Sequence, residues 1–398
     1  MFTSHIRTYI FFSYCLWFWI SGIVQATNQQ DIPLFKAYPK LKDLVGYVHL
    51  GNFPTAVQKL ENLGSLVGAQ SLYIKKDNES GTLFGGNKVR KLEFLLGDAV
   101  KNNAKGILTM GFAGSNHTCA TAIYAKQLGL NCVCLHLPQM ITSYLRRNLL
   151  LSHHYQADLH LFKTSGQRDK ALHEINKQFR QTNQTSLYLI PSGGSNELGA
   201  AGFVNAAFEL KEQIQQGLLP EPDYIYVALG SAGTAAGLIV GAKVAGLKST
   251  IVPICIEPDD VEKQHEKKLL HLIKITGKVL NRCDESFPLI TMTPEQIAIN
   301  YNFIGQGYAF ISPEAYDAIN LMLTNEGIKL EGTYTGKACA AMLNDIVNKG
   351  IKDKVILFWN SFGAGEFTDI IKDTDYTKLP SEYHPYFTCN LQPNDQGV

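Results

Sequence analysis

The sequence has no excess of either charge. The chain has 36 Lys and Arg residues against 35 Asp and Glu residues, without long basic tails or acidic runs. A nucleic-acid binder would show a basic bias, so no nucleic-acid partner is expected. The 398 residues are 45% hydrophobic, which is enough for a large core and for two domains. These properties favour an enzyme or a binding protein whose partner is a small molecule.

Cysteine is scarce and follows no metal-binding pattern. Neither CxxC nor HExxH occurs, so no metal site is expected. After Cys15, seven cysteines remain, which is an odd number. Four of them lie in apolar runs and are expected to be small buried hydrophobic residues rather than a disulfide framework: Cys132, Cys134, Cys255 and Cys339.

Long hydrophobic runs are also missing, except at the N-terminus. There, an apolar run over residues 9–24 follows His5 and Arg7, and Val24-Gln25-Ala26 offers a small-x-small cleavage site. This layout predicts a secretory signal peptide, residues 1–26, and export to the periplasm or the medium. The run is shorter than the roughly 20 residues of a membrane-spanning helix. An uncleaved membrane anchor is the alternative.

Beyond this segment, short apolar strands, Gly/Ser turns and helices follow one another repeatedly. The repeats lie at residues 106–130, 187–210 and 224–247, and a further strand and turn lie at 354–367. This alternation predicts an α/β fold with parallel sheets covered on both faces. Ligands bind such folds at the carboxyl ends of the strands, where these turns lie. The tail after Lys372 is expected to be irregular surface structure.

The turn Gly230–Thr234 has the composition of a phosphate cradle. Small residues let backbone N–H groups gather around an anion, the start of a helix adds partial positive charge, and Ser231 and Thr234 add hydroxyl donors. The alternative is that Gly and Ala only permit tight packing of the helix on the strand. Neither GxGxxG nor a Walker A loop occurs. Glu257 nevertheless ends the next strand, where a dinucleotide fold places its ribose-binding acid, so a nicotinamide-dependent oxidoreductase remains an alternative.

The stretch FGGNKVRKLEF places three cations at the start of a helix. Lys88, Arg90 and Lys91 follow two glycines, although the helix dipole disfavours positive charge there. The cluster is either a solvated face or a site for an anion. A lysine in a Gly turn, together with a phosphate cradle, predicts pyridoxal 5'-phosphate (PLP), whose aldehyde forms a Schiff base with lysine. Lys91 lies one turn after Lys88 on the same face and could reach the phosphate.

Five motifs resemble the PLP-dependent family of D-cysteine desulfhydrase and 1-aminocyclopropane-1-carboxylate (ACC) deaminase. They are GGNKVRKLEFL (85–95), SNHTCATA (115–122), PSGGSNELGAAGF (191–203), GSAGTAAGL (230–238) and YTGKACA (334–340). The resemblance runs from about residue 44 to residue 363. It implies a tryptophan-synthase-β-like fold, with PLP between two three-layer α/β/α domains, and a homodimer. The larger domain would comprise residues 27–92 and 191–398, and the smaller one residues 93–190.

The matched motifs also imply the roles of individual residues. Lys88 matches the Schiff-base lysine, Lys91 a phosphate contact, and Asn116 the partner of the cofactor's ring oxygen. The phosphate loop matches Ser231, Ala232, Gly233 and Thr234. The resemblance implies a catalytic set of Lys88, Ser115, Tyr308 and Tyr334, and a substrate-binding set of Ser115, Asn116 and His117. By their residue types alone, the two tyrosines would be amphipathic core residues and His117 a helix-start residue with a local hydrogen bond.

Three departures from the family pattern bear on the substrate. Thr335 stands where ACC deaminases carry Glu, and Ser361 where they carry Leu and desulfhydrases usually carry Thr. Ser361 or Thr335 is therefore expected at the cofactor's pyridine nitrogen, and a D-cysteine desulfhydrase-like lyase that acts on a small amino acid is favoured. Cys119 replaces the usual Arg, and changes at residues 111–114 and at Phe362 flank the same pocket. ACC deaminase, another amino-acid lyase or racemase, and a non-catalytic PLP-binding protein are the alternatives.

Overall fold

Two β-sheets form the frame of the protein in the computed structural model, which describes residues 32–258, 263–363 and 365–395. The larger sheet has the strand order β1-β2-β9-β7-β8; β1 is antiparallel to β2, and the other pairs are parallel. Its strands are β1 (Val57–Lys59), β2 (Leu72–Lys75), β7 (Tyr224–Leu229), β8 (Thr250–Cys255) and β9 (Ile356–Trp359). The smaller sheet, in the order β5-β4-β3-β6, is entirely parallel. Its strands are β3 (Gly106–Phe112), β4 (Asn131–Leu137), β5 (Asp158–Leu161) and β6 (Tyr188–Ile190).

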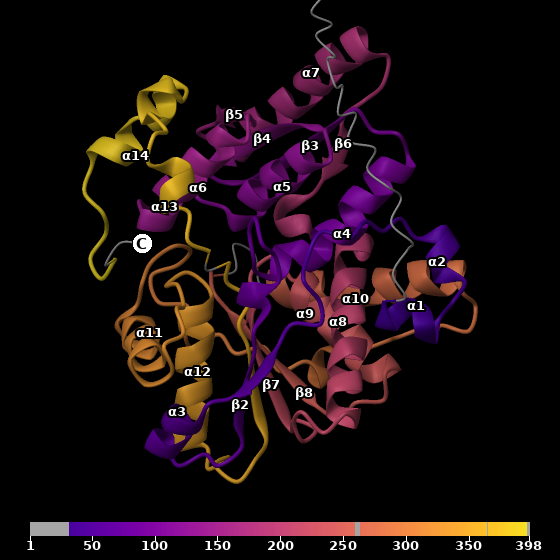
Figure 1. The fold of residues 1–398 in the computed structure, drawn as a ribbon, viewed down its shortest axis with the longest axis vertical. Coiled ribbons are helices and arrows are strands. Elements are labelled where there is room, and N and C mark those ends of the chain that lie inside the picture. The colour runs from indigo at the N-terminus through magenta and orange to yellow at the C-terminus, as the bar shows by residue number, and fades with distance from the viewer. Residues whose placement is uncertain (1–31, 259–262, 364, 396–398) are drawn as a thin grey trace, which may run out of the picture.

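Helices cover both faces of the larger sheet, because its central strands are apolar on both sides (Figure 1). In β9, Leu357 and Trp359 pack into one core, while Ile356 and Phe358 pack into the other, as the period of two requires. The first core is covered by α1 (Pro33–Ala37), α8 (Glu197–Gln215), α9 (Gly233–Val244) and α10 (Gln264–Cys283). The second is covered by α3 (Glu61–Val67), α11 (Pro313–Glu326) and α12 (Thr335–Asn348).

The smaller sheet is covered in the same way. One face packs against α5 (Asn116–Gln127) and α6 (Ser143–His154), and the other against α7 (Ser165–Asn183). These layers confirm the α/β class with parallel sheets that the alternating strands and helices predicted. Shorter elements connect the layers: α2 (Leu41–Leu44), η1 (Asp77–Glu79), η2 (Ser192–Gly194), η3 (Pro294–Gln296), η4 (Tyr376–Lys378) and η5 (Ser381–Tyr383).

The C-terminal segment packs on the smaller sheet's side of the molecule. Its helices α13 (Thr368–Ile371) and α14 (Pro385–Thr388) lie beside α6 (Figure 1). Tyr383 is fully buried, and its hydroxyl lies 2.9 Å from Nδ1 of His136 in β4. The segment after Lys372 is mostly irregular and exposed, as expected, apart from the short helices η4, η5 and α14. Its aromatic side chains bury against α6 and β4, which the composition of the tail alone did not indicate.

Helix α4 (Asn87–Lys101) joins the two halves and packs tightly on α8. A Cβ added to Gly202 of α8 would lie 2.1 Å from the carbonyl oxygen of Arg90. Another at Gly237 of α9 would lie 2.2 Å from the carbonyl oxygen of Ala200. Backbone therefore lies almost directly against backbone across α4, α8 and α9, and only glycine fits at these crossings.

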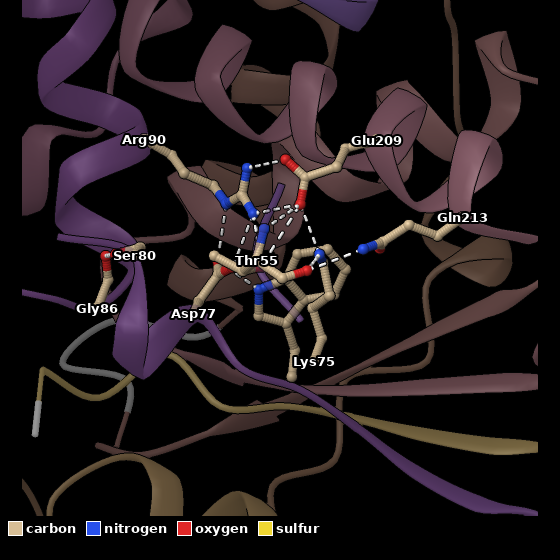
Figure 2. Close-up of polar contacts among 9 residues, drawn as sticks. Thr55, Lys75, Asp77, Ser80, Gly86, Arg90, Glu209 and Gln213 are labelled. Atoms are coloured by element: carbon tan, nitrogen blue, oxygen red, sulfur yellow. Dashed lines mark hydrogen bonds and ion pairs between the residues drawn. The ribbon is translucent and has the colours of Figure 1, made fainter. Parts of the chain in front are cut away.

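A buried ionic cluster ties α4 to the larger sheet (Figure 2). Arg90 donates to both oxygens of Asp77, at 2.8 and 2.9 Å, and to both oxygens of Glu209 in α8, at 2.8 and 2.9 Å. Lys75 of β2 also donates to Glu209, so two buried cations face two buried anions. Burial raises the pKa of Glu209, but the charges of Arg90 and Lys75 outweigh it and hold this pKa at about 2. Trp359 donates its indole N–H to Asp77 at 2.7 Å and completes the cluster.

The structure also bears on the cysteines, on possible metal ligands and on membrane-spanning helices. Within the described ranges, all seven cysteines are free, and the four in apolar runs are buried. The same residues contain no group of three or more His, Cys, Asp or Glu side chains placed to hold a metal ion. No helix among them is both long and apolar enough to cross a membrane. The predicted signal peptide, residues 1–26, lies outside the described residues.

Candidate active site

A cavity of about 170 Å³ lies where the carboxyl ends of strands from both sheets converge. Six of the parallel strands contribute a wall residue at their carboxyl ends, as expected for ligand sites in such folds. These residues are Phe112 (β3), Leu137 (β4), Gly193 (after β6), Gly230 (after β7), Glu257 (after β8) and Ser361 (after β9). The Gly-rich turns singled out in the sequence therefore surround one space.

Lys88, in the first turn of α4, lies in the wall of this cavity. Its Nζ donates to Oδ1 of Asn87 at 2.8 Å, and Nδ2 of Asn87 donates to the Thr234 hydroxyl at 3.0 Å. Asn87 thus links the lysine to the predicted phosphate cradle. Burial lowers the pKa of the Lys88 amine to about 8, and the Glu331 carboxylate opposes this shift. A substantial fraction of the amine is therefore neutral near physiological pH.

The predicted phosphate cradle lies at the start of α9. Ala232, at its N-cap, has φ +70°, a left-handed conformation that costs a non-glycine residue roughly 1–2 kcal/mol. This conformation lets the helix N-terminus open on the cavity, whose wall includes Ser231, Ala232 and Thr234. The N–H of Gly233 donates to Oγ of Ser195 at 3.2 Å. Dipole, hydroxyls and backbone together form an anion site.

Lys91 adds a cation to this anion site from α4. It is 1% exposed, and its Nζ donates to the Gly193 carbonyl at 3.0 Å and to Oγ of Ser195 at 3.1 Å. Burial, together with the charges of Lys88 and Lys268, lowers the pKa of Lys91 well below its usual value. Two neighbouring lysines thus disfavour a charge on Lys91, which has no carboxylate paired to it among the described residues. A bound dianion would relieve this repulsion.

Ser195 is a site residue that the sequence reading missed. Its hydroxyl contacts Lys91, the N–H of Gly233, and Oγ of Ser231 at 2.7 Å, so it holds three anion-binding groups together. A Cβ on Gly233 would lie 2.6 Å from this oxygen and 3.0 Å from Nζ of Lys91. The signal was present, because Ser195 lies in the quoted motif PSGGSNELGAAGF. Its role depends on the meeting of η2 with α9, which no local pattern shows.

The smaller half contributes the N-terminus of α5 to the opposite wall. Ser115 caps this helix, its Oγ accepting the N–H groups of His117 at 3.1 Å and Thr118 at 3.4 Å. Ser115, Asn116 and His117 all line the cavity. His117 is 2% exposed, and its Nδ1 has no hydrogen-bond partner among the described residues. Burial, and then the charges of Lys88 and Lys91, lower its pKa well below the usual value, so the ring is neutral.

Two tyrosines close the cavity from the larger half. The hydroxyl of Tyr334 donates to that of Tyr308 at 2.8 Å, and the Tyr308 ring stacks on Phe112 at 4.5 Å. Burial raises the pKa of both hydroxyls, so both stay protonated. Nζ of Lys88 lies 6.0 Å from the Tyr334 ring centre. The loop bearing Tyr308 is held by Lys337, which donates to the Gly307 carbonyl at 2.7 Å.

This geometry agrees with comparisons to known proteins. The family model for pyridoxal-phosphate-dependent enzymes matches residues 48–361. The chain belongs to this family. It is 32% identical over 336 residues to a Pyrococcus furiosus protein provisionally named 1-aminocyclopropane-1-carboxylate deaminase, covering 83% of this chain and 97% of that protein. The crystal structure of an ACC deaminase homologue superposes with a TM-score of 0.71 at 29% identity, covering 85% of this chain and 98% of the other.

More distant PLP enzymes share the fold. Threonine deaminase isoform 2 from Solanum lycopersicum has a TM-score of 0.56 at 16% identity and covers 88% of this chain and 95% of its own. The family match shows that PLP is the cofactor, and the nicotinamide alternative is set aside. Three features of the site fit PLP. The anion site has no room for a Cβ at Gly233, and the pKa of the Lys88 amine is lowered to about 8. Nδ1 of His117 has no hydrogen-bond partner among the described residues. Glu257, proposed for the nicotinamide alternative, pairs with His265 at 3.5 Å.

Among the predicted PLP contacts, Gly233 and Thr335 are not residues of the cavity wall. Gly233 donates its N–H to Ser195 beside the wall, whereas Thr335 lies elsewhere. It is buried at the start of α12, and its hydroxyl donates to the Glu331 carboxylate at 3.2 Å. It does not line the cavity, whereas Ser361 does. Of the two hydroxyls expected at the pyridine nitrogen, only that of Ser361 therefore belongs to a residue of the cavity wall. Glu331, which was not predicted, lines the cavity and accepts the N–H groups of Thr333, Tyr334 and Thr335.

Proposed function

We propose that this PLP enzyme is a lyase that eliminates a thiol from a small amino acid such as D-cysteine. In the overall reaction, D-cysteine and water give pyruvate, ammonia and hydrogen sulfide. The observation that carries the proposal is Lys88, whose amine of lowered pKa shares one cavity with an anion cradle and two protonated tyrosines. Ser361 supports the choice of elimination, because a neutral hydroxyl at the cofactor's ring nitrogen favours prompt departure of a leaving group.

The residues of this chain that would hold PLP follow from the cavity walls. Lys91 and the N-terminus of α9 would bind the phosphate, Asn116 the ring oxygen, and Ser361 the ring nitrogen, while Lys88 would hold the aldehyde carbon. Bound in this way, the cofactor supplies an electron sink for the electron pair left at the substrate's Cα.

Protein groups would move the protons. With a pKa of about 8, Nζ of Lys88 can accept the substrate's Cα proton near neutral pH. The hydroxyl of Ser115 and the dipole of α5 would bind the substrate carboxylate. Because Tyr334 donates to Tyr308, the Tyr308 proton remains free for a departing thiolate. The two tyrosines would thus act as one donor to the leaving group.

ACC deaminase is the alternative, and the comparisons favour it by name. Purified enzyme should release pyruvate from D-cysteine faster than 2-oxobutanoate from ACC, measured for both at equal substrate concentration. L-Cysteine and D-serine serve as controls for stereochemistry and leaving group. A faster reaction with ACC would refute the choice of substrate. A coloured protein that turns over no amino acid would instead indicate a PLP-binding protein.

Assembly and location belong to the proposal as well. A homodimer is supported by the family resemblance, and export by the N-terminal sequence pattern. Size-exclusion chromatography with light scattering would test the first. N-terminal sequencing of the protein recovered from the medium or the periplasm would test the second, with a new N-terminus at Thr27 expected.

A further inference from the structure

A chain of amide groups leads from the cavity wall into α6. Asn116, which lines the cavity, accepts a hydrogen bond through Oδ1 from Nδ2 of Asn148 at 2.8 Å. The same Nδ2 donates to the Gly114 carbonyl at 2.9 Å. Oδ1 of Asn148 accepts from Nε and Nη2 of Arg147 at 3.1 and 3.0 Å. Asn148 is 1% exposed and Arg147 is 5% exposed, so water does not compete for these contacts.

The two ends of this series of hydrogen bonds determine which atom of each amide donates and which accepts. An arginine can only donate and a carbonyl can only accept. The oxygen of Asn148 must therefore face Arg147, and its nitrogen must face Gly114 and Asn116. Asn116 in turn must present its oxygen to Asn148, which leaves its own amide N–H groups for the cavity. We propose that Arg147 and Asn148 are positioning residues that fix Asn116 as a hydrogen-bond donor to the ring oxygen of PLP.

Arg147 is held in place by aromatic rings. Its guanidinium carbon lies 5.0 Å from the ring centre of Tyr144, 5.1 Å from Phe367, and 5.7 Å from both Phe84 and Phe362. No carboxylate forms an ion pair with it in the described part of the chain. Cation–π contacts therefore replace an ion pair. The donors on Nε and Nη2 thus stay directed at one amide oxygen.

The fixed orientation has a measurable consequence for bound PLP. A donor to the ring oxygen stabilises negative charge there, which favours the deprotonated form of the bound cofactor. Loss of this donor should raise the pH midpoint of the cofactor's visible absorbance change by about one unit and weaken PLP binding about tenfold. The inference rests on PLP occupying this cavity and not on the choice of substrate. A failure with D-cysteine would leave it unaffected.

Asn148→Asp tests the inference directly. Its carboxylate would still accept from Arg147, but it would present a second oxygen to Asn116 and reverse that amide. We expect the raised pH midpoint and the weaker PLP binding, measured by titrating apoenzyme with PLP. In the Asn116→Ala background, Asn148→Asp should have no further effect on either quantity, because Asn148 acts through Asn116. An additive effect, or a wild-type midpoint in Asn148→Asp, would overturn the inference.

Two further comparisons separate positioning from folding. Ser152→Ala is the matched control, because the Ser152 hydroxyl donates to the backbone carbonyl of Asn148 at 2.7 Å and does not touch the amide chain. It should lower thermal stability but leave the midpoint unchanged. Arg147→Lys keeps a donor and should retain the midpoint, whereas Arg147→Met should raise it. If Asn148→Asp does not fold, this pair decides: equal midpoints in the two variants would overturn the inference.

Discussion

The reactivity of Lys88 should depend on pH in a way that an ordinary lysine would not show. With a pKa of about 8, lowered by burial, the amine is about 10% neutral at pH 7 and about 90% neutral at pH 9. At pH 7 the neutral fraction exceeds that of an ordinary lysine, with a pKa of about 10.4, by roughly 200-fold. The rate at which apoenzyme captures PLP should therefore rise about tenfold from pH 7 to pH 9 and then level off.

The assay mixes apoenzyme with PLP in a stopped-flow instrument and follows the visible absorbance at each pH. An N-acetylated lysine amide provides the ordinary amine, and its rate should climb about a hundredfold over the same interval. Glu331→Gln removes the carboxylate that raises the pKa of Lys88, so its plateau should begin at lower pH. A wild-type rate that rises tenfold per unit up to pH 10 would refute the reasoning.

Three further predictions concern single residues. Lys88→Ala should abolish both the visible absorbance and turnover, and an unchanged spectrum would refute the assignment of this lysine. Glu209→Gln should lower the free energy of unfolding in urea by about 3–5 kcal/mol, because Arg90 and Lys75 lose a buried partner; Glu212→Gln, at an exposed pair, should cost at most about 1 kcal/mol. In the wild type, the contribution of Glu209 is present above about pH 4.5 and is lost as the pH falls toward 2, so Glu209→Gln should flatten this part of the profile. Gly193→Ala, whose Cβ would lie 2.1 Å from Oγ of Ser231, should weaken PLP binding at least about tenfold, whereas Gly217→Ala, with a similar φ and open space, should not.

The fold class could be predicted because the parallel strands are short apolar runs followed by Gly-rich turns. Strands β3, β6, β7 and β9 are such runs, and each sheet contains two of them. Strands β1 and β2 were not anticipated. They have three and four residues and contain charged side chains, so the pairing of β2 with β9 and of β1 with β2, rather than local sequence, defines them.

The candidate site was predictable where its residues lie in turns. Lys88 and the Gly230–Thr234 turn stand out by composition and spacing, whereas Asn116 was named only through the family resemblance; the structure brings all of them to one cavity. Thr335 was misplaced, because sequence does not show that its side chain turns toward Glu331. Cys119 illustrates a further limit. Cys119 stands where the family usually carries an arginine, and the structure places Arg147, from another helix, close enough for its charge to lower the pKa of the Cys119 thiol against the effect of burial.

The two sides of the cavity are held by different parts of the fold. The end of α4 bearing Lys88 and Lys91 is fastened through Arg90 to Asp77 and Glu209. Ser115 and Asn116 line the opposite side of the cavity, and they lie at the start of α5, which packs on the smaller sheet. A change in the packing of either sheet's layers would therefore shift one wall of the site relative to the other.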